Sequence, residues 1–370
     1  MKKILFVVNV DWFFVSHRLP LAIEALERGY EVFIACEVTD KQEYLEKLGM
    51  KVYPLNISRS KTGLVSELKA VMSIYRAIKE ISPDIAHFIT IKPVLYGGIV
   101  SRILSLKKKV FSISGLGFIF IQEGFKASLV KKVVKFLYFI ALSGKKSHVI
   151  VQNPNDKEII HSICTVPITT IRGFGVNLDA YIYKEEENTA ITVVMACRLL
   201  KDKGVFEFVE AAKMIHAKDA KIKFKLYGDI DSHNPASLSE KDIKSIKKDA
   251  IVEVHGFSQN ISKAFEDSSI VVLPSYREGL PKVLIEAAAC GRAVVTTDVP
   301  GCRDAIEVNR TGLLCEVKNA QDLAEKIERL IVDEELRHGM GRAGRELAQK
   351  EFDIKNVIAM HFKIYEDGNE

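Results

Sequence analysis

The sequence predicts an α/β protein built from two doubly wound parallel-sheet domains. Short apolar, β-branched segments alternate with helical patterns through the first half of the 370 residues, which is the order of a parallel sheet with crossover helices. A charged connector at 184–188 interrupts this pattern, and the same alternation then restarts. The chain is too long for one ordinary core and fits two domains.

The first half alternates predicted strands and helices. Its opening, 1–15, has the basic start and apolar run of a secretory signal, but Asn9 and Asp11 interrupt the run and no cleavage pattern follows. We therefore interpret 4–9 as a buried first strand. The predicted strands are 4–9, 31–36, 51–56, 85–89, 110–114 and 148–152, and the predicted helices are 16–28, 64–81, 95–105 and 127–143.

A glycine-rich segment at 172–177 ends this first series, and we place the domain boundary between residues 180 and 181. The predicted strands of the second half are 191–197, 222–227, 252–255, 270–273 and 293–297. A long charged helix is predicted over 333–350, and an amphipathic segment follows at 353–365. The predicted domains are therefore 1–180 and 181–352, followed by a C-terminal helix within 353–370.

Charge is divided unevenly between the halves. The first 179 residues carry a net charge of +10 and the remainder −5, which together give the +5 of the whole chain. No aromatic and basic RNA signature or zinc finger accompanies the basic half, so nucleic-acid binding is not predicted. The six cysteines form no CxxC pair, which favours reduced core thiols. No apolar run has the length of a bilayer span, so we expect a cytoplasmic protein.

The stretch 270–291 is the most informative part of the chain. An apolar strand, a polar turn and a helical pattern follow one another, and Pro281 fits the first helical position. The free amides of such a helix start attract anions at the carboxyl end of a parallel strand. Glu278 and Glu286 flank this feature as a Glu-x7-Glu pair. Each is alternatively a solvated glutamate, although the apolar residues 283–290 give Glu286 little polar company.

This Glu-x7-Glu pair, with Gly279-Leu280-Pro281 inside it, resembles the signature of the retaining nucleotide-sugar glycosyltransferases of GT-B fold, family 4 (group 1). The resemblance covers nearly the whole chain. Segments 115–130 and 272–295 are similar to a bacterial branch that adds N-acetylgalactosamine or related sugars to polyprenyl-diphosphate-linked glycans. It implies two Rossmann-like domains facing a cleft, an acceptor-binding first domain, a donor-binding second domain and a C-terminal helix that crosses back onto the first.

Arg198 and Lys203 follow the strand 191–197 and match the family's Arg-x4-Lys diphosphate clamp. Alone, such a pair is more simply two solvated loop charges. At a strand end in the same half as the glutamate pair, an arginine fork and a lysine point charge both suit a diphosphate. Charge grows on the leaving diphosphate as the glycosidic bond breaks, so preplaced cations favour the transition state.

The resemblance implies the remaining donor contacts. Glu286 is expected to bind the ribose diol, and Glu278 the sugar hydroxyls. The other implied contacts are the amides of Gly279 and Leu280 with the sugar, Pro281 at the helix start, and the backbone of Gly256 and Phe257 with uracil.

Asp229 and Asp231 form an Asp-x-Asp pair, the pattern of a metal site in the other major glycosyltransferase fold. Here the pair lies in a polar loop after Gly228 that is typical of an exposed turn. Because Arg198 and Lys203 already offer the charge that a metal would bring, we expect neither a metal nor another cofactor, with a UDP-sugar as co-substrate.

Candidates in the first half are less certain in role. His87 lies inside the strand 85–89, where a histidine is alternatively a hydrogen-bonded core residue; the family likeness would place it, or Lys92, near the donor sugar. Gly115 and Gly117 follow another strand, where glycine permits a close approach of a substrate to the backbone.

Many relatives carry a glycine pair after the first strand, whereas this chain has Asn9-Val10-Asp11-Trp12-Phe13. A glycine-loop phosphate contact from the first domain is therefore in doubt. We expect Ser16, His17 and Arg18, at a helix start, to contact the acceptor or its phosphate instead.

The segment from Phe125 to Lys146 has a helical pattern that carries six lysines beside aromatic residues and no acidic residue. Anionic lipid attracts interfacial lysines by about 1 kcal/mol each, and apolar side chains add to the binding. The alternative is a core-packing helix with a basic edge. We expect this segment to hold the protein peripherally on the inner face of the cytoplasmic membrane.

We predict a metal-independent retaining glycosyltransferase that moves a hexose or N-acetylhexosamine from a UDP-sugar to a polyprenyl-diphosphate-linked glycan, in bacterial O-antigen, capsule or glycoprotein glycan assembly. A UDP-sugar epimerase of the same plan is the alternative, and it would need no acceptor. A dehydrogenase is disfavoured because no G-x-G-x-x-G follows the first strand. A non-catalytic scaffold is disfavoured by the intact Arg198, Lys203, Glu278 and Glu286.

Overall fold

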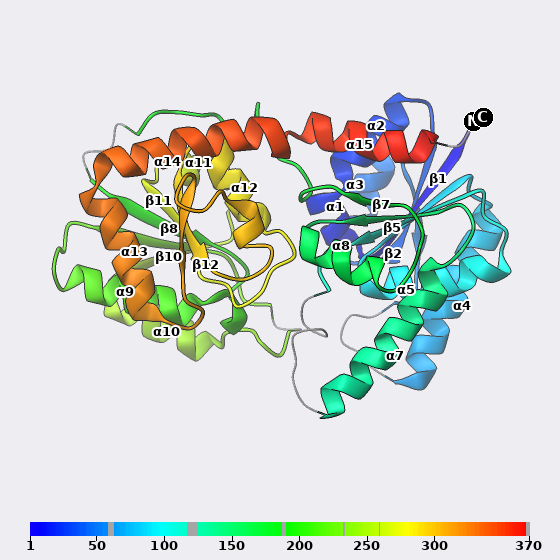
Figure 1. Ribbon diagram of the computed structural model, residues 1–370, viewed down its shortest axis with the longest axis horizontal. Helices are drawn as coiled ribbons and strands as arrows, with labels where there is room; N and C mark the ends of the chain where they lie inside the picture. Colours follow the sequence, from blue (N-terminus) through cyan, green and yellow to red (C-terminus); the bar gives the residue numbers. More distant parts are fainter. Residues whose placement is uncertain (58–62, 117–124, 187–189, 232–233, 259, 368–370) are drawn as a thin grey trace. The chain divides into compact units, whose positions relative to one another are not determined.

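The computed structural model describes residues 1–57, 63–116, 125–186, 190–231, 234–258 and 260–367 (Figure 1). The chain divides into two compact units. Unit 1 comprises Met1–Phe174 and Val357–Glu370, and unit 2 comprises Gly175–Asn356. The chain thus leaves unit 1 a few residues before the predicted boundary and returns to it at its C-terminal end.

Unit 1 is built on a parallel sheet of strand order β3-β2-β1-β4-β5-β6-β7. The strands are β1 (Lys3–Val10), β2 (Glu31–Glu37), β3 (Lys51–Pro54), β4 (Ile85–Ile89), β5 (Lys108–Ile113), β6 (Ser147–Val151) and β7 (Ile168–Thr170). Neighbouring residues of β1 enter different cores: Leu5 and Val7 pack on one face, and Ile4 and Phe6 on the other. Because both faces are covered, β1 is an almost continuous apolar run.

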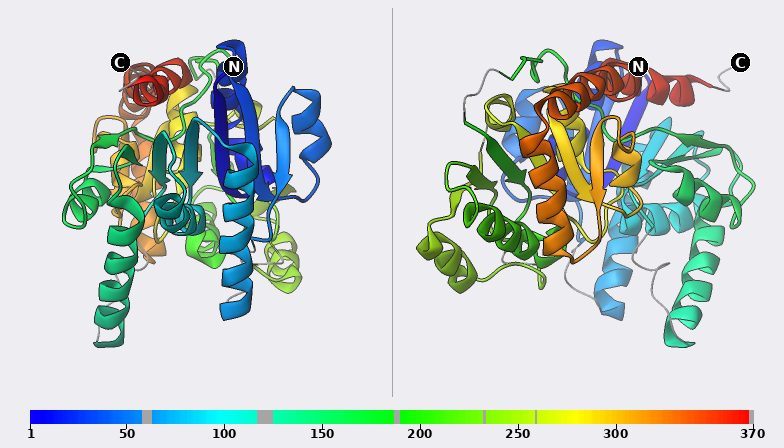
Figure 2. Two further views of the ribbon diagram at one scale, coloured as in Figure 1. Left: turned by 90° about the vertical axis from the view of Figure 1, so that its right-hand side faces the viewer. Right: turned by 60° about the vertical axis from the view of Figure 1, so that its left-hand side comes forward.

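Helices cover both faces of this sheet (Figure 2). On one face the core includes side chains of α4 (Leu64–Ile81), α5 (Ile91–Ile103) and α7 (Phe125–Leu142). On the other it includes side chains of α2 (Leu19–Glu27) and α15 (Ile354–Glu366). The remaining helices of this part are α1 (Asp11–His17), α3 (Gln42–Lys47) and α8 (Pro154–His161).

Unit 2 has a second parallel sheet, of order β10-β9-β8-β11-β12-β13. Its strands are β8 (Thr192–Ala196), β9 (Lys223–Tyr227), β10 (Val252–Gly256), β11 (Ile270–Leu273), β12 (Ala293–Thr297) and β13 (Gly312–Cys315). Its helical elements are η1 (Lys201–Lys203), α9 (Val205–His216), α10 (Glu240–Asp249), α11 (Ile261–Glu266), α12 (Lys282–Ala289), η2 (Arg303–Ala305), α13 (Ala320–Val332), α14 (Glu334–Leu347) and a π turn, η3 (Ala348–Phe352).

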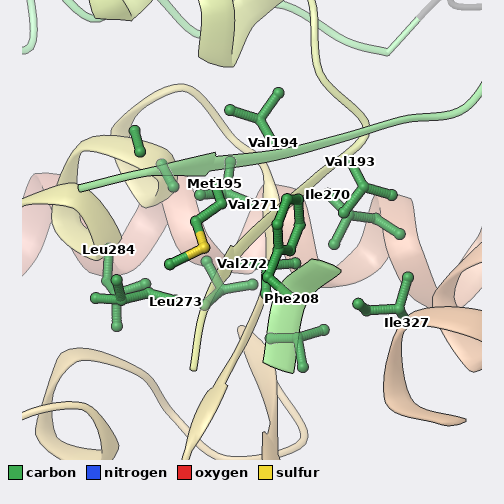
Figure 3. Close-up of a cluster of buried hydrophobic side chains, with 14 of the residues drawn as sticks. Val193, Val194, Met195, Phe208, Ile270, Val271, Val272, Leu273, Leu284 and Ile327 are labelled. Carbon is green, nitrogen blue, oxygen red and sulfur yellow. The ribbon is translucent and has the colours of Figure 1, made fainter. Parts of the chain in front are cut away.

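The two central strands of this sheet, β8 and β11, form the middle of the unit 2 core (Figure 3). Their side chains are fully buried and pack with Phe208 of α9, Leu284 of α12 and Ile327 of α13. This packing fixes the ends of β8 and β11, from which the predicted donor residues extend.

All eleven predicted strands are confirmed, three of them (85–89, 270–273 and 293–297) with the predicted bounds. The helix predicted over 16–28 is confirmed as α2 for residues 19–27, but its predicted start is wrong, because the backbone at Arg18 (φ −130°, ψ −8°) separates α1 from α2. Strands β7 and β13 were not predicted; three or four residues are too few to show a period. All six cysteines are free thiols and five are buried, as predicted.

Candidate active site

The strand order of unit 2 brings the predicted donor residues to one point of its sheet. The chain begins at β8, adds β9 and β10 on one side, and returns to add β11, β12 and β13 on the other. Strands β8 and β11 are therefore neighbours at the topological switch point, where open α/β sheets bind ligands beyond the carboxyl ends of the strands. Arg198 and Lys203 follow β8, and Glu278 follows β11.

Backbone contacts fasten the turn after β8 to the turn after β11. The Asp202 carbonyl accepts hydrogen bonds from the Tyr276 N–H (2.9 Å) and the Ser275 hydroxyl (3.1 Å). Gly204 has φ +77°, and a Cβ there would lie 2.2 Å from the Pro274 carbonyl oxygen. Only glycine satisfies both the conformation and the close approach, so the separation of the two turns is fixed.

The loop after β12 supports the same turn from the other side. The Thr297 hydroxyl donates to the Ser275 carbonyl. Gly301 (φ +81°) passes so close beneath the turn that a Cβ there would lie 2.5 Å from the carbonyl oxygens of both Glu278 and Gly279. The backbone that carries Glu278 is therefore held between two neighbouring strand ends.

Lys203 and Glu278 form an ion pair across the switch point. Their side chains are only 18% and 12% exposed, so each charge is largely removed from water. Burial alone would lower the pKa of Lys203, but the Glu278 carboxylate outweighs burial and the net shift of this pKa is upward. The pair therefore places a cation, which can bind an anion, next to a carboxylate, which can accept hydrogen bonds.

Arg198 forms a more exposed ion pair with Asp231 (2.9 Å). Asp229, the other member of the Asp-x-Asp pair, accepts a hydrogen bond from the Phe257 N–H (3.2 Å) and so orders the turn at Gly256 (φ +71°). Both carboxylates thus have protein partners in the donor region. Within the described ranges, no cluster of three or more His, Cys, Asp or Glu side chains has the arrangement of a metal site.

Glu286 lies within α12, and its residue is 6% exposed. Its Oε1 accepts a hydrogen bond from the Tyr181 hydroxyl and pairs with Lys282 Nζ at 3.1 Å. Pro281 occupies the N-cap and not the first helical position that was predicted for it, because α12 begins at Lys282. The Leu280 side chain is buried in the core.

Two family models match the chain: "Glycosyl transferase 4-like" over residues 3–153 and "Glycosyl transferases group 1" over residues 181–347. The chain is also 32% identical, over 366 residues, to the N,N'-diacetylbacillosaminyl-diphospho-undecaprenol alpha-1,3-N-acetylgalactosaminyltransferase of Campylobacter jejuni, covering 94% of each chain. The protein belongs to the group 1 glycosyl transferases. It is a glycosyltransferase enzyme, as predicted.

Solved structures confirm the GT-B fold. Sucrose-phosphate synthase from Thermosynechococcus elongatus matches with a TM-score of 0.78 at 18% identity, over 99% of this chain and 98% of the other. The Anabaena protein HepE in complex with UDP and glucose matches with a TM-score of 0.76 at 17% identity, over 99% and 100%. The prediction of two doubly wound parallel-sheet domains is therefore correct.

In unit 1 of this glycosyltransferase, His87 is fully buried in β4. Its Nδ1 is hydrogen-bonded with the Tyr365 hydroxyl (2.7 Å) and its Nε2 with Ser112 Oγ (2.6 Å). Burial, with a smaller contribution from Arg18, holds the pKa of His87 well below its ordinary value, so the ring is neutral. His87 has the features of a hydrogen-bonded core histidine, and we do not carry it into the proposed function.

Lys92 lies in the first turn of α5, after β4, at the switch point between β1 and β4 of unit 1. Its Nζ pairs with Glu67 of α4 at 2.8 Å, and the Tyr96 hydroxyl donates to the same carboxylate. Gly115 has φ +123° at the end of β5, a conformation that favours glycine. Gly117 lies outside the described residues.

Of the predicted acceptor residues, Arg18 lies at a helix start, as the N-cap of α2, whereas Ser16 and His17 do not. The first helix begins at Asp11, so Ser16 and His17 end α1 and Arg18 precedes α2. Ser16 is exposed, and His17 stacks on Phe13 with ring centroids 4.3 Å apart. Arg18 is 3% exposed and bonds His361 at 3.0 Å; burial lowers its pKa to about 10. Arg18 thus links α1 to α15 inside unit 1.

Sequence reasoning missed three residues of the donor region: Tyr181, Asp231 as the partner of Arg198, and Lys282. Tyr181 gives no local signal, because it meets Glu286 from 105 positions away. Lys282 does give one. A lysine in the first turn of a helix opposes the helix dipole, which marks it as a residue placed there for another reason.

Proposed function

We propose that this protein is a retaining, metal-independent glycosyltransferase that transfers a hexose or N-acetylhexosamine from a UDP-sugar to a polyprenyl-diphosphate-linked glycan. The observation that carries the proposal is the Lys203–Glu278 ion pair at the switch point of unit 2, with Arg198 beside it on the same turn. A UDP-sugar presents an anionic diphosphate next to a ring of hydroxyls, and this pair offers a partner to each.

Arg198 and Lys203 hold the donor diphosphate in this proposal. Negative charge grows on the diphosphate as the glycosidic bond breaks, and cations already in place stabilise that charge without reorganisation. Because two fixed cations supply this stabilisation, the reaction needs no divalent metal and no other cofactor. Glu278, supported by the Gly279 and Leu280 amides, accepts hydrogen bonds from the sugar hydroxyls.

The nucleoside contacts use the other residues of the same sheet edge. Glu286 accepts hydrogen bonds from the ribose, and the backbone at Gly256 and Phe257, held by Asp229, contacts the uracil. The leaving phosphate itself takes the acceptor proton, so we assign no side chain as general base. In unit 1, Gly115 remains our candidate for an acceptor contact, and Lys92 remains our candidate for a contact with the donor sugar.

The names of relatives support the acceptor class. The Campylobacter jejuni relative acts on a diphospho-undecaprenol-linked sugar. An Escherichia coli relative, 24% identical over 320 residues, is a UDP-Gal:alpha-D-GlcNAc-diphosphoundecaprenol alpha-1,3-galactosyltransferase. We extend this class of acceptor to the present chain, with a role in O-antigen, capsule or glycoprotein glycan assembly.

Unit 1 offers a surface for such a membrane-bound acceptor. None of the described helices combines the length and the hydropathy of a membrane span. Helix α7 instead exposes Val133, Phe136 and Phe139 next to Lys132 and Lys135, while its other side packs in the core. Helix α4 also exposes apolar residues, namely Val65, Leu68 and Met72. Both helices extend past the sheet in the same direction (Figure 2). We propose that they rest on the cytoplasmic leaflet.

A panel of UDP- and GDP-sugars, scored by thermal shift, tests the donor class. We expect one UDP-sugar to stabilise the protein, and turnover with a polyprenyl-diphosphate-linked acceptor to follow with that donor, insensitive to EDTA. Product NMR should show the anomeric configuration of the donor. A GDP-sugar as the sole donor, or an inverted product, would contradict the proposal.

Flotation with phosphatidylglycerol vesicles tests the membrane surface. We expect salt-sensitive binding that is lost when Lys131, Lys132 and Lys135 are replaced by glutamate. The matched control replaces Lys244, Lys247 and Lys248, exposed lysines around α10 of unit 2, with the same change of charge. Equal loss of binding in the two triple variants would show that net charge, and not α7, is responsible.

A further inference from the structure

One oxygen of Glu286 is already engaged by the protein. The Tyr181 hydroxyl and the Lys282 ammonium both meet Oε1, and the Glu286 side chain is 7% exposed. One hydrogen bond and one ion pair thus converge on Oε1. No donor from the described residues bonds Oε2. The carboxylate is therefore asymmetric, with one oxygen anchored and one available.

The anchoring tyrosine is itself held firmly. Its carbonyl accepts a hydrogen bond from Nη1 of Arg345 (2.8 Å), which also bonds the Ala289 carbonyl (2.7 Å) at the end of α12. Its N–H bonds the Asn177 carbonyl (3.0 Å). Burial, and then the Glu286 carboxylate, raise the pKa of Tyr181 far above neutrality, so its hydroxyl remains a donor. Tyr181 is thus tied to the helix that carries Glu286.

Lys282 is placed at a local cost. A cation in the first turn of a helix opposes the dipole, and lysine preceding glutamate at i,i+4 is the weaker order of such a pair. Breaking a local rule without a local gain is expected at functional sites. Here the Lys282 ammonium provides the second contact to Oε1 of Glu286.

We infer that Tyr181 and Lys282 are positioning residues that turn Glu286 so that Oε2 accepts the ribose hydroxyls of the donor. The inference rests on the proposed function, because it requires a ribonucleotide in unit 2. It goes beyond the proposed function in one respect. Recognition of the ribose diol depends on two side chains that do not themselves touch the ligand.

Calorimetry with UDP and 2′,3′-dideoxy-UDP tests this role. The wild type should bind UDP at least about tenfold more tightly than the dideoxy nucleotide, the size of a hydrogen bond to a charged group. Tyr181→Phe and Lys282→Met should remove most of that difference and leave dideoxy-UDP affinity unchanged. Lys282→Arg, which keeps the positive charge, should retain the difference in affinity between the two nucleotides. Tyr183→Phe, in the same segment, is the matched control and should behave as the wild type.

A double-mutant cycle separates positioning from general damage. In a Glu286→Ala background, Tyr181→Phe should have no further effect on UDP affinity, because its only target is gone. Equal weakening of both nucleotides by Tyr181→Phe, or an undiminished effect in the Glu286→Ala background, would overturn the inference and leave the proposed function intact. A wild-type protein that binds neither nucleotide would overturn both.

Discussion

The two units share one topology and use their switch points differently. In unit 2, the turn after β8 carries two cations that pair with carboxylates of neighbouring turns: Lys203 with Glu278 after β11, and Arg198 with Asp231 after β9. In unit 1, the equivalent position after β1 carries Asp11, whose carboxylate accepts the N–H groups of Thr39 (2.7 Å) and Lys41 (3.0 Å). The two side chains of an ion pair can separate and bind a ligand instead. The Asp11 carboxylate, in contrast, is already used to order its own loop.

Unit 1 also contains buried polar groups. Arg18 bonds His361 of α15 (3.0 Å), and His87 of β4 bonds Tyr365 of the same helix (2.7 Å). These contacts join the C-terminal helix to the first strands of the sheet. The units therefore differ at their switch points but not in their interiors, since unit 2 also buries a structural ion pair, between Arg337 of α14 and Glu186 (2.9 Å).

The largest expected effect is at Glu278. Glu278→Gln should lower turnover by about 100-fold or more, the scale for losing a transition-state contact, and should change UDP affinity by less than about twofold. Arg198→Ala should lower both turnover and UDP affinity. Steady-state kinetics and calorimetry measure the two effects. Glu307→Gln, at an exposed pair with Arg310, is the control. Equal loss of UDP binding in the first two variants would contradict the division of roles.

Gly301→Ala should destabilise unit 2 by about 3 kcal/mol, combining left-handed strain with overpacking against the Glu278 turn. Gly29→Ala in unit 1 is a close control. Gly29 has φ +78°, but a Cβ there meets nothing within 4 Å, so only the strain of about 1–2 kcal/mol applies. Urea unfolding of both variants measures the difference. Similar losses in the two would show that the close approach at Gly301 is relaxed in solution.

Acid should weaken unit 1 before unit 2. Burial lowers the pKa of His361 to about 3 and that of His87 well below its ordinary value. Above pH 6.5 both are neutral whether folded or unfolded. Below it the unfolded chain takes up protons that the folded unit does not, so stability falls by about 1.4 kcal/mol per pH unit for each histidine. Hydrogen exchange at pH 7 and pH 5 should show β4 losing more protection than β11. Parallel loss in both strands would contradict this.

The smallest effect is expected at Asp231. Its pair with Arg198 is partly exposed, with side chains 42% and 23% accessible, so Asp231→Asn should change UDP affinity by no more than about fivefold. Activity should be the same with EDTA present. If the Asp231→Asn variant loses bound Mn²⁺ and activity together, Asp231 is a metal ligand. The comparison of the two ion pairs would then be wrong.

The sequence predicted those parts of the site that depend on local order. Strand, turn and helix follow one another within 270–291, so Glu278 and Glu286 are placed by their spacing, and Arg198 and Lys203 by their distance from β8. The strand order then brings the turns together. What no local pattern shows is the partner that arrives from far along the chain.

His87 and Arg18 illustrate the limit. Both have the chemistry of a functional residue, but Tyr365 reaches His87 across 278 positions and His361 reaches Arg18 across 343. For Tyr181 the prediction from sequence errs in the opposite direction. The sequence around it suggests an ordinary loop tyrosine, and only the fold shows its contact with Glu286. Long-range contacts decide whether a polar side chain faces a ligand or the core, and those contacts are properties of the fold.

The ion pairs of unit 2 also determine which small anions the proposed site admits. Inorganic phosphate must displace Glu278 from Lys203 and Asp231 from Arg198 before it binds, and it offers those carboxylates nothing in return. The hydroxyls of a nucleotide sugar can donate hydrogen bonds to Glu278 and so replace the contact that it loses with Lys203. The proposed site would therefore disfavour inorganic phosphate, because its cations are already paired with carboxylates, and this is selectivity by exclusion.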